Sequence, residues 1–411
     1  MARLGALENS LLLASRMLLL KVFASLLWII GLLLVSPAHA QTSLLGPVDR
    51  DYFGLALYRA DAQTPWPAVP FGAWRMWDAY VTWFDLEPDR GRWDFSRLDR
   101  YVNEAAAHDV KVLLVLAHSP VWAAARPAER GAYGLARSSE PADIADWRNY
   151  VRTVASRYKG RILEYQVWNE PSDKTHYSGT VEKLIEMTCE AYKVLKSIDG
   201  NIKLVSGGSA GGGGHVKYLD SFLAQGGAKC IDVVAHHFYA PRFAPEAMVP
   251  LIREVRAVMQ ARSVAHLPLW NTETGWWIAN TDGVPEQDAS PKGGWRKLDA
   301  GLEMGSVVQR ALLLARAEGV ARFYWYAWSN RIWGLADAKG NPKAGLVYWT
   351  ELFELILGRQ IVACRQDDGT YACDIRDPGQ RVKTLQWRDS SALVSREGPS
   401  EMPASVSGLP R

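Results

Sequence analysis

Apolar residues along the chain follow two alternating patterns, and this alternation predicts the architecture. Between residues 96 and 106 they recur at i, i+3 and i+4, which is typical of an amphipathic helix. Residues 110–117 then form an almost continuous apolar run of the kind that buried parallel strands show. The same order recurs along the chain. The predicted strands are 52–58, 73–77, 110–117, 165–170, 202–206, 231–237, 267–272 and 321–327, and the predicted helices are 96–106, 143–158, 181–198, 216–224, 246–261, 302–318 and 349–358.

Eight strands that are mostly separated by helices predict an α/β fold of the (β/α)8 class, the TIM barrel, over residues 41–358. A doubly wound open sheet is the alternative. No GxGxxG follows the first predicted strand, so the dinucleotide-binding version of that fold has little support.

The pattern changes to short strands after residue 358, which predicts a small C-terminal β appendage over 359–389. Asp368-Gly369 reads as a two-residue hairpin turn, and counting outward from it sets Cys364 opposite Cys373. This is a non-hydrogen-bonded pair, whose close Cα atoms suit a disulfide. The other two cysteines, Cys189 and Cys230, either pair or stay free. The tail, 390–411, is rich in Ser, Pro and Gly and is expected to be disordered.

The first 40 residues read as a signal peptide. Basic residues precede the apolar run 22–35, and Ala38 and Ala40 form a small-x-small cleavage site, so the mature chain is expected to begin at Gln41 in the periplasm or outside the cell. An uncleaved membrane anchor is the alternative, because residues 11–20 lengthen the apolar region. The net charge is +3 and no Lys/Arg block follows the signal, so composition does not support nucleic-acid binding. The oligomeric state is left open.

Candidate chemistry lies at the ends of two predicted strands. Functional residues of a barrel sit at the C-terminal ends of its strands. The fourth strand ends in Asn169-Glu170-Pro171, where the proline should end the strand and bias Glu170 toward an extended conformation. The seventh strand ends in Glu273. Two carboxyl groups that face each other across a barrel mouth are what cleavage of a glycosidic bond requires.

These motifs resemble the signatures of clan A, a large group of retaining glycoside hydrolases. The resemblance rests on 169–171 and 272–275, and segments 83–88 and 91–99 are similar to the connection after strand two in these enzymes. It covers nearly the whole barrel. Within the clan the sequence looks closest to family 39 and to bacterial relatives that cut exopolysaccharides, with family 5 as a near neighbour.

The resemblance implies that Glu170 is the acid/base and Glu273 the nucleophile of a double displacement. An acid that starts the reaction protonated should have a raised pKa, so we expect this of Glu170. The implied substrate is a polysaccharide or oligosaccharide, and bacterial exopolysaccharide is one candidate within this class. No cofactor or metal is expected. Two alternatives use the same scaffold: a carbohydrate-binding protein without hydrolytic activity, and a transglycosylase in polysaccharide assembly.

Other strand ends add candidate substrate-binding residues. Arg75 on strand two is expected beside Glu273, where a guanidinium favours the charged carboxylate. Asn169 can hydrogen-bond a sugar 2-hydroxyl, an interaction that strengthens in the transition state. His118 ends strand three and is expected to touch the sugar.

Strand six ends in His237-Phe238-Tyr239, and the resemblance implies that the Tyr239 hydroxyl lies against the nucleophile. A metal site at His236 and His237 is disfavoured, because adjacent strand residues point to opposite faces. The glycine-rich run 207–214 lacks the Lys-Ser/Thr of a P-loop and reads as a flexible rim loop. Aromatic rings stack on sugars. The candidate platforms near strand ends are Trp122, Trp276, Trp277, Trp325 and Trp328.

Overall fold

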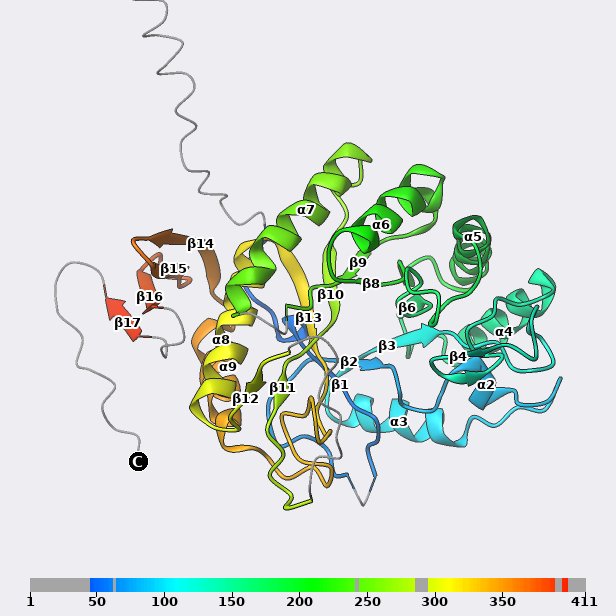
Figure 1. Cartoon of the computed structure of the whole chain (residues 1–411), viewed down its shortest axis with the longest axis horizontal. Coiled ribbons are helices and arrows are strands. Elements are labelled where there is room, and N and C mark those ends of the chain that lie inside the picture. Colours follow the sequence, from blue (N-terminus) through cyan, green and yellow to red (C-terminus); the bar gives the residue numbers. More distant parts are fainter. Residues whose placement is uncertain (1–44, 62–63, 241–243, 285–294, 389–393, 398–411) are drawn as a thin grey trace, which may run out of the picture. The chain divides into compact units, whose positions relative to one another are not determined.

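The computed structural model describes residues 45–61, 64–240, 244–284, 295–388 and 394–397 (Figure 1). The predicted signal peptide lies outside these residues, so its cleavage stays a prediction. Within the described ranges, no helix is long and apolar enough to cross a membrane.

Parallel strands form the centre of the fold. In chain order they are β1 (Phe53–Ala56), β2 (Ala73–Met76), β3 (Lys111–Leu116), β6 (Glu164–Val167), β7 (Lys203–Val205), β9 (Val234–His237), β10 (Leu269–Thr274) and β13 (Val320–Trp325). Their order in the sheet is β7-β6-β3-β2-β1-β13-β10-β9, and the short β8 (Ser209–Ala210) adds beside β9. Val205 forms a parallel bridge to Val233, and Ser206 N donates to Val233 O at 3.0 Å. This bridge closes the sheet, and the predicted (β/α)8 barrel is confirmed.

The helices surround these strands (Figure 1). They are α2 (Trp83–Leu86), α3 (Ser96–Ala107), α4 (Ile144–Arg157), α5 (Val181–Ile198), α6 (Gly214–Ala224), α7 (Met248–Ala261), α8 (Leu302–Ala317) and α9 (Val347–Ile356). Short 3-10 turns are η1 (Arg50–Tyr52), η2 (Gly227–Cys230), η3 (Pro245–Ala247) and η4 (Ala344–Leu346). Two small strand pairs lie in the loops between these elements: β4 (Arg130–Gly131) with β5 (Gly134–Leu135), and β11 (Trp277–Ile278) with β12 (Lys297–Leu298). All seven predicted helices are present.

Helix α8 is covered on every side. All its residues from Met304 to Ala317 are buried, because α7, α9 and β14 (Gln360–Asp367) of the C-terminal appendage pack around it. This explains why its sequence is apolar around most of its circumference rather than along one stripe.

Side chains from the strands fill the interior of the barrel. The interior cluster consists of Ala73, Leu113, Val205, Val233, Ala235, Trp270 and Tyr324. Beneath it Arg322 forms an ion pair with Glu164, and each side chain is 6% exposed. The guanidinium of Arg322 also lies 4.1 Å from the ring centroid of Trp270. Because Glu164 is the first residue of β6, this pair marks the N-terminal end of the barrel, which in this fold serves stability rather than chemistry.

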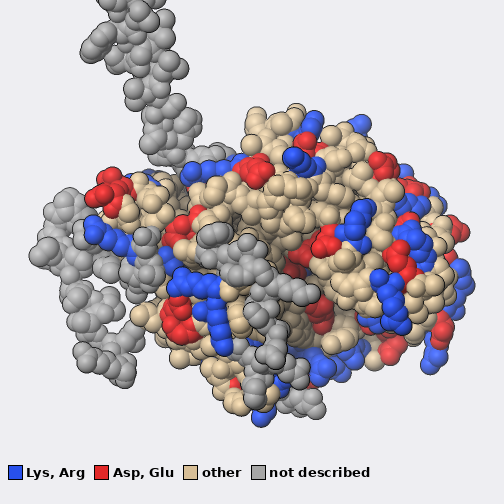
Figure 2. Space-filling view, viewed as in Figure 1, with Lys and Arg blue, Asp and Glu red and all other residues tan. Residues whose placement is uncertain are grey.

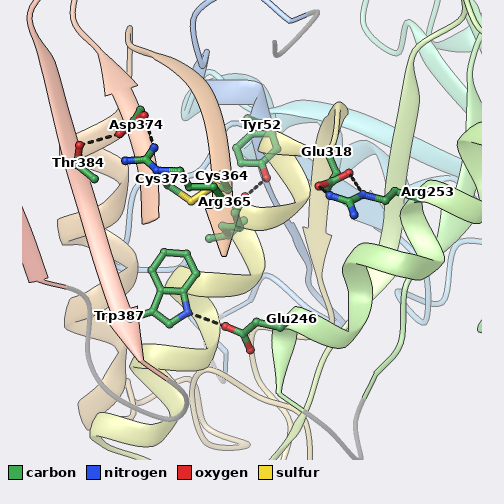
Figure 3. The surroundings of a disulfide bond; sticks show 11 residues. Tyr52, Glu246, Arg253, Glu318, Cys364, Arg365, Cys373, Asp374, Thr384 and Trp387 are labelled. Carbon is green, nitrogen blue, oxygen red and sulfur yellow. Dashed lines mark hydrogen bonds and ion pairs between the residues drawn. A yellow bond between two sulfur atoms is a disulfide. The ribbon is translucent and has the colours of Figure 1, made fainter. Parts of the chain in front are cut away.

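An antiparallel sheet follows the barrel: β14 (Gln360–Asp367), β15 (Thr370–Arg376), β16 (Val382–Arg388) and β17 (Val394–Glu397). Cys364 pairs in register with Cys373, their Cα atoms are 4.1 Å apart, and a disulfide joins them as predicted. Trp387 of β16 donates its indole N–H to Glu246 at 2.7 Å, which ties the sheet to the segment leading into α7 (Figure 3).

The fourth strand corrects one expectation. β17 lies inside the tail that was predicted to be disordered, and its backbone pairs with β16. Composition alone missed this, because the pairing depends on an open sheet edge and not on the propensity of the segment. The rest of 390–411 lies outside the described residues.

A second disulfide settles the pairing that the sequence left open. Cys189 of α5 is bonded to Cys230 of η2, with 4.9 Å between their Cα atoms. It joins the helix after β6 to the turn before β9 and closes a separation of 41 residues.

Candidate active site

Glu170 reaches the barrel mouth by an unexpected backbone path. Strand β6 ends at Val167, and Trp168 and Glu170 then adopt φ values of 63° and 46°, in the left-handed region. The extended conformation expected before Pro171 is therefore wrong. Tertiary hydrogen bonding overrides the local preference, because the N–H of Glu170 donates to the carbonyl of Gly208 at 2.9 Å.

Gly208 also has a steric role. A Cβ at this position would lie 2.4 Å from Nε2 of His237 and 2.7 Å from Oγ1 of Thr272. Only glycine allows the chain to pass this close to His237. The prediction of a flexible rim loop over 207–214 thus fails at its first residues, which pack tightly against the site and continue into β8.

Glu273 lies in β10 and is held by two hydrogen bonds. Arg75 donates to Oε2 at 2.7 Å, and the hydroxyl of Tyr239 donates to Oε1 at 2.9 Å. The structure therefore places both residues beside Glu273, where they were predicted. Burial, followed by the nearby charge of Glu273, raises the pKa of Tyr239 well above its usual value, so its hydroxyl remains a donor.

Arg75 joins the two glutamate-bearing strands. Its side chain is fully buried, and it donates to Gln166 at 2.8 Å and to Asn169 at 2.6 Å, in addition to Glu273. Such a fork fixes three acceptors in one plane, which a lysine could not do. The Asn169 amide also donates to the hydroxyl of Tyr133 at 3.2 Å. Contact between Asn169 and a sugar stays a prediction.

The two carboxylates and a histidine converge. One ligand atom each from Glu170, His237 and Glu273 lie within 4.8 Å of one another. Both oxygens of Glu273 accept hydrogen bonds from protein donors, Arg75 and Tyr239, so this carboxylate is already engaged without a cation. The Glu170 carboxylate lies close enough for the two side chains to act on one bound molecule.

Two histidines contact the Glu170 carboxylate. His237 Nδ1 lies 2.9 Å from Oε1 and His176 Nδ1 lies 2.8 Å from Oε2. Burial raises the pKa of Glu170, but the contacts with His176 and His237 outweigh burial and lower it. For His176, burial lowers the pKa, and the Glu170 carboxylate more than reverses this, so its pKa is raised. The expected raised pKa of Glu170 is therefore wrong for the unliganded protein.

His118 lies at the end of β3 with φ 50° and is 4% exposed. Its ring is 4.6 Å from that of Tyr133 and 5.1 Å from that of Trp77. Burial, followed by the charges of Arg137 and His176, lowers the pKa of His118 to about 3. It is therefore a neutral imidazole in an aromatic setting.

Three of the predicted sugar platforms are contradicted. Trp276, Trp325 and Trp328 are 0%, 0% and 1% exposed, so they offer no face for a sugar. The rings of Trp276 and Trp325 stack on each other at 5.6 Å and fill the core.

The other two tryptophans are half-buried and each is faced by a basic side chain. Trp122 packs against Trp83 and under Arg90, whose guanidinium is 4.3 Å from its ring centroid. The ring of Trp277 is faced by Lys297 at 5.2 Å. Position after a strand does not distinguish a platform from a core residue, since both are apolar and aromatic.

Several residues of the site were not predicted. Tyr133 and His176 come from the loops after β3 and β6, and Asp78 and Tyr326 follow β2 and β13. Loop residues show no periodicity, so no sequence pattern pointed to them. Asp78 lies three residues after Arg75 in the sequence, and this proximity was the signal that could have identified it.

On the face shown in Figure 2, acidic and basic side chains are interspersed over the outer helices.

Comparisons with known proteins agree with this arrangement. The sequence profile described as glycosyl hydrolase family 10 matches residues 78–205. A beta-xylosidase of Geobacillus stearothermophilus is 25% identical over 210 residues, which cover 44% of this chain and 40% of that protein. The matched region is thus less than half the length of that relative.

Solved structures share the fold. A family 39 glycoside hydrolase from Bacteroides cellulosilyticus superimposes with a TM-score of 0.61 at 18% identity, covering 78% of this chain and 65% of that one. A monomeric beta-xylosidase from Caulobacter crescentus gives a TM-score of 0.62 at 19% identity, covering 84% and 76%. The profile and the beta-xylosidase match support the resemblance to clan A glycoside hydrolases, and the two solved structures, one of them a family 39 enzyme, show the same fold.

Proposed function

We propose that this protein is a retaining glycoside hydrolase that cleaves O-glycosidic bonds of a polysaccharide or oligosaccharide by double displacement. The proposal rests on the proximity of Glu170 and Glu273, whose nearest ligand atoms lie within 4.8 Å. Retaining enzymes hold their carboxyl groups about 5 to 5.5 Å apart, whereas inverting enzymes leave roughly 6.5 to 9.5 Å for a water molecule.

In this mechanism Glu273 attacks the anomeric carbon. Arg75 and Tyr239 hold its carboxylate in place, and both contacts are made before substrate binds. A preorganised nucleophile requires no rearrangement at the moment of reaction. The covalent glycosyl-enzyme is then hydrolysed by water.

Glu170 acts as the acid and then as the base. It must carry a proton when the leaving group departs, although its carboxylate is ionised in the unliganded site. His176, whose pKa is raised and which contacts the same carboxylate at 2.8 Å, is a neighbour that can hold this proton. Once Glu273 is esterified it no longer carries charge, and Glu170 accepts a proton from water.

The substrate is the finer part of the proposal. The two beta-xylosidases among the similar proteins support β-xylosides as the first compounds to test. Bacterial exopolysaccharide is the second substrate class. We further propose that residues 41–358 carry catalysis, that the sheet after 358 is an accessory element, and that the protein works in the periplasm or outside the cell. Two disulfides support an oxidising compartment.

The decisive experiment follows the anomeric product by NMR during hydrolysis of p-nitrophenyl β-xyloside and of a panel of polysaccharides. Retention is expected, and an inverted first product would contradict the mechanism. Glu273→Ala should abolish turnover. Azide should partly restore turnover to Glu170→Ala, because this anion attacks the anomeric carbon of the glycosyl-enzyme without needing a base, releasing Glu273 and a glycosyl azide. The matched control is Asp89→Asn, an acid whose side chain is 69% exposed, which should keep full activity.

Two further measurements separate the alternatives. Product analysis with an added sugar acceptor would reveal transglycosylation if the transferred product exceeds the hydrolysed one. Binding of a glycan without turnover across the whole panel would instead indicate a carbohydrate-binding protein. Chelation with EDTA should leave the rate unchanged, since both carboxylates act as acid, base or nucleophile.

A further inference from the structure

A cavity of about 280 Å³ is lined by residues that follow barrel strands β1, β2 and β3, among them Tyr58, Asp78 and His118. Tyr133 lines this cavity and connects it to the candidate site, because its hydroxyl accepts from Asn169, the neighbour of Glu170, and its ring packs against His118. Thr82 also lines the cavity. The proposed mechanism assigns no role to Asp78.

Asp78 has the same backbone peculiarity as Glu170. Its φ is 56°, against 46° for Glu170 and 50° for His118, and each residue follows a barrel strand. Left-handed conformations are unfavourable for such residues and persist where the surrounding structure imposes them, often at binding sites. The Asp78 side chain is thus aimed by the fold rather than by local preference.

A directional chain of hydrogen bonds ends on Asp78. Asn330 donates to the hydroxyl of Tyr58 at 2.8 Å, Tyr58 donates to the hydroxyl of Tyr326 at 2.6 Å, and Tyr326 donates to Asp78 Oδ2 at 2.7 Å. Both hydroxyl protons are therefore committed toward the carboxylate. A carboxylate has about four acceptor positions, so Asp78 retains capacity for a donor from a ligand in the cavity.

His118 supplies an independent observation. Its Nε2 is buried and has no hydrogen-bond partner in the described part of the chain. A buried polar atom without a partner is unfavourable, and it commonly marks a place where a ligand or water binds. Because the same side chain lines the cavity, a hydroxyl there could satisfy it.

We propose that this cavity is a sugar subsite and that Asp78 is its specificity-determining residue, accepting a hydrogen bond from one hydroxyl of a neutral sugar while a second hydroxyl pairs with His118. The proposal rests on the proposed function, since it assumes a glycan ligand. Asp78 would thus distinguish sugars by the positions of their hydroxyl groups, which neither proposed catalytic glutamate does. Sugars whose hydroxyls are placed differently would leave Asp78 or His118 without a partner and would bind less tightly.

Calorimetric binding to a Glu170→Gln protein tests the subsite without turnover. The probes are xylotriose, cellotriose and mannotriose, which differ in the hydroxyls and hydroxymethyl groups that they present. We expect one of them to bind best, and Asp78→Asn in this background to weaken that binding roughly 10- to 100-fold, as for a hydrogen bond to a charged group. The differences among the three probes should shrink at the same time, which a purely structural role would not produce. His118→Phe should weaken the same probe.

Asp78→Asn keeps the shape of the side chain, and its amide oxygen can still accept from Tyr326, so this variant should fold. Asp89→Asn in the same background is the control and should bind like its parent. Unchanged affinity in Asp78→Asn, or no binding of any of the three probes, would overturn the subsite. Failure of the proposed function would appear separately, as lack of turnover by the wild-type protein.

Discussion

Nδ1 of His176 lies 2.8 Å from Oε2 of Glu170, at ion-pair distance but without hydrogen-bond geometry, so the proposed acid has as its charge partner a histidine from the loop that follows its own strand. This contact and the one with His237 lower the pKa of Glu170, against the effect of burial. In the unliganded protein the proton that the acid needs is therefore favoured on His176.

The first prediction concerns pH. Cleavage requires protonated Glu170, so kcat/KM should fall as pH rises through the pKa of this group in the free enzyme. His176→Phe removes one of the contacts that lower this pKa while burial, which raises it, remains. The basic limb of the kcat/KM profile should therefore move to higher pH. The rate at the optimum should fall, because the histidine that holds the proton for Glu170 is lost.

A pH series with an aryl glycoside checks this, and His266→Gln, which replaces an exposed histidine, is the control. A basic limb that stays in place or moves to lower pH in His176→Phe would show that His176 does not set the protonation of Glu170.

The second prediction concerns Arg75. Arg75→Lys keeps the positive charge but loses the fork that joins Gln166, Asn169 and Glu273. Because charge-assisted contacts to the nucleophile act in a buried site, kcat/KM should fall by about 100-fold or more. Steady-state kinetics beside Arg92→Lys, whose native side chain is 79% exposed, provides the comparison. A loss below about threefold would exclude the fork from catalysis.

The barrel and the positions of the two glutamates could be predicted because they depend on periodic sequence. Alternation of apolar strands with amphipathic helices fixes the order of the strands, and the order places the ends of β6 and β10 at one mouth. Glu170, Glu273 and Arg75 follow from that placement alone. The Cys364–Cys373 bond followed in the same way, from counting along one hairpin.

The remainder of the site depends on contacts between loops. The left-handed conformation of Glu170 follows from a hydrogen bond to Gly208, which is distant in sequence. The pKa of Glu170 depends on His176 and His237, and no local pattern reveals that both reach it. The buried tryptophans failed as platforms because the sequence does not show which side of a ring other residues cover.

The third prediction concerns the ion pair at the N-terminal end of the barrel. Arg322 and Glu164 are both nearly buried, so Glu164→Gln leaves the guanidinium with only the more distant carboxylate of Asp51 at 3.2 Å. Removing one partner of a buried pair should lower the free energy of unfolding by about 3 kcal/mol. Urea denaturation measures this, and Glu186→Gln, at a partly exposed pair with Lys183, should change it by less than about 1 kcal/mol. Equal losses of stability in the two variants would show that water reaches the Arg322–Glu164 pair.

The last prediction compares the two disulfides. Cys189–Cys230 spans 41 residues and Cys364–Cys373 spans 9, so the first removes more conformational entropy from the unfolded chain. The chain-entropy relation puts the difference at about 1.3 kcal/mol. Replacing Cys189 and Cys230 by serine should therefore lower the free energy of unfolding more than replacing Cys364 and Cys373, as measured in urea. The longer bond also joins α5 to η2 within the barrel, whereas the shorter one crosses a single hairpin whose strands already pair. If the hairpin variant proved the less stable of the two, the appendage and not the barrel would limit the stability of the protein.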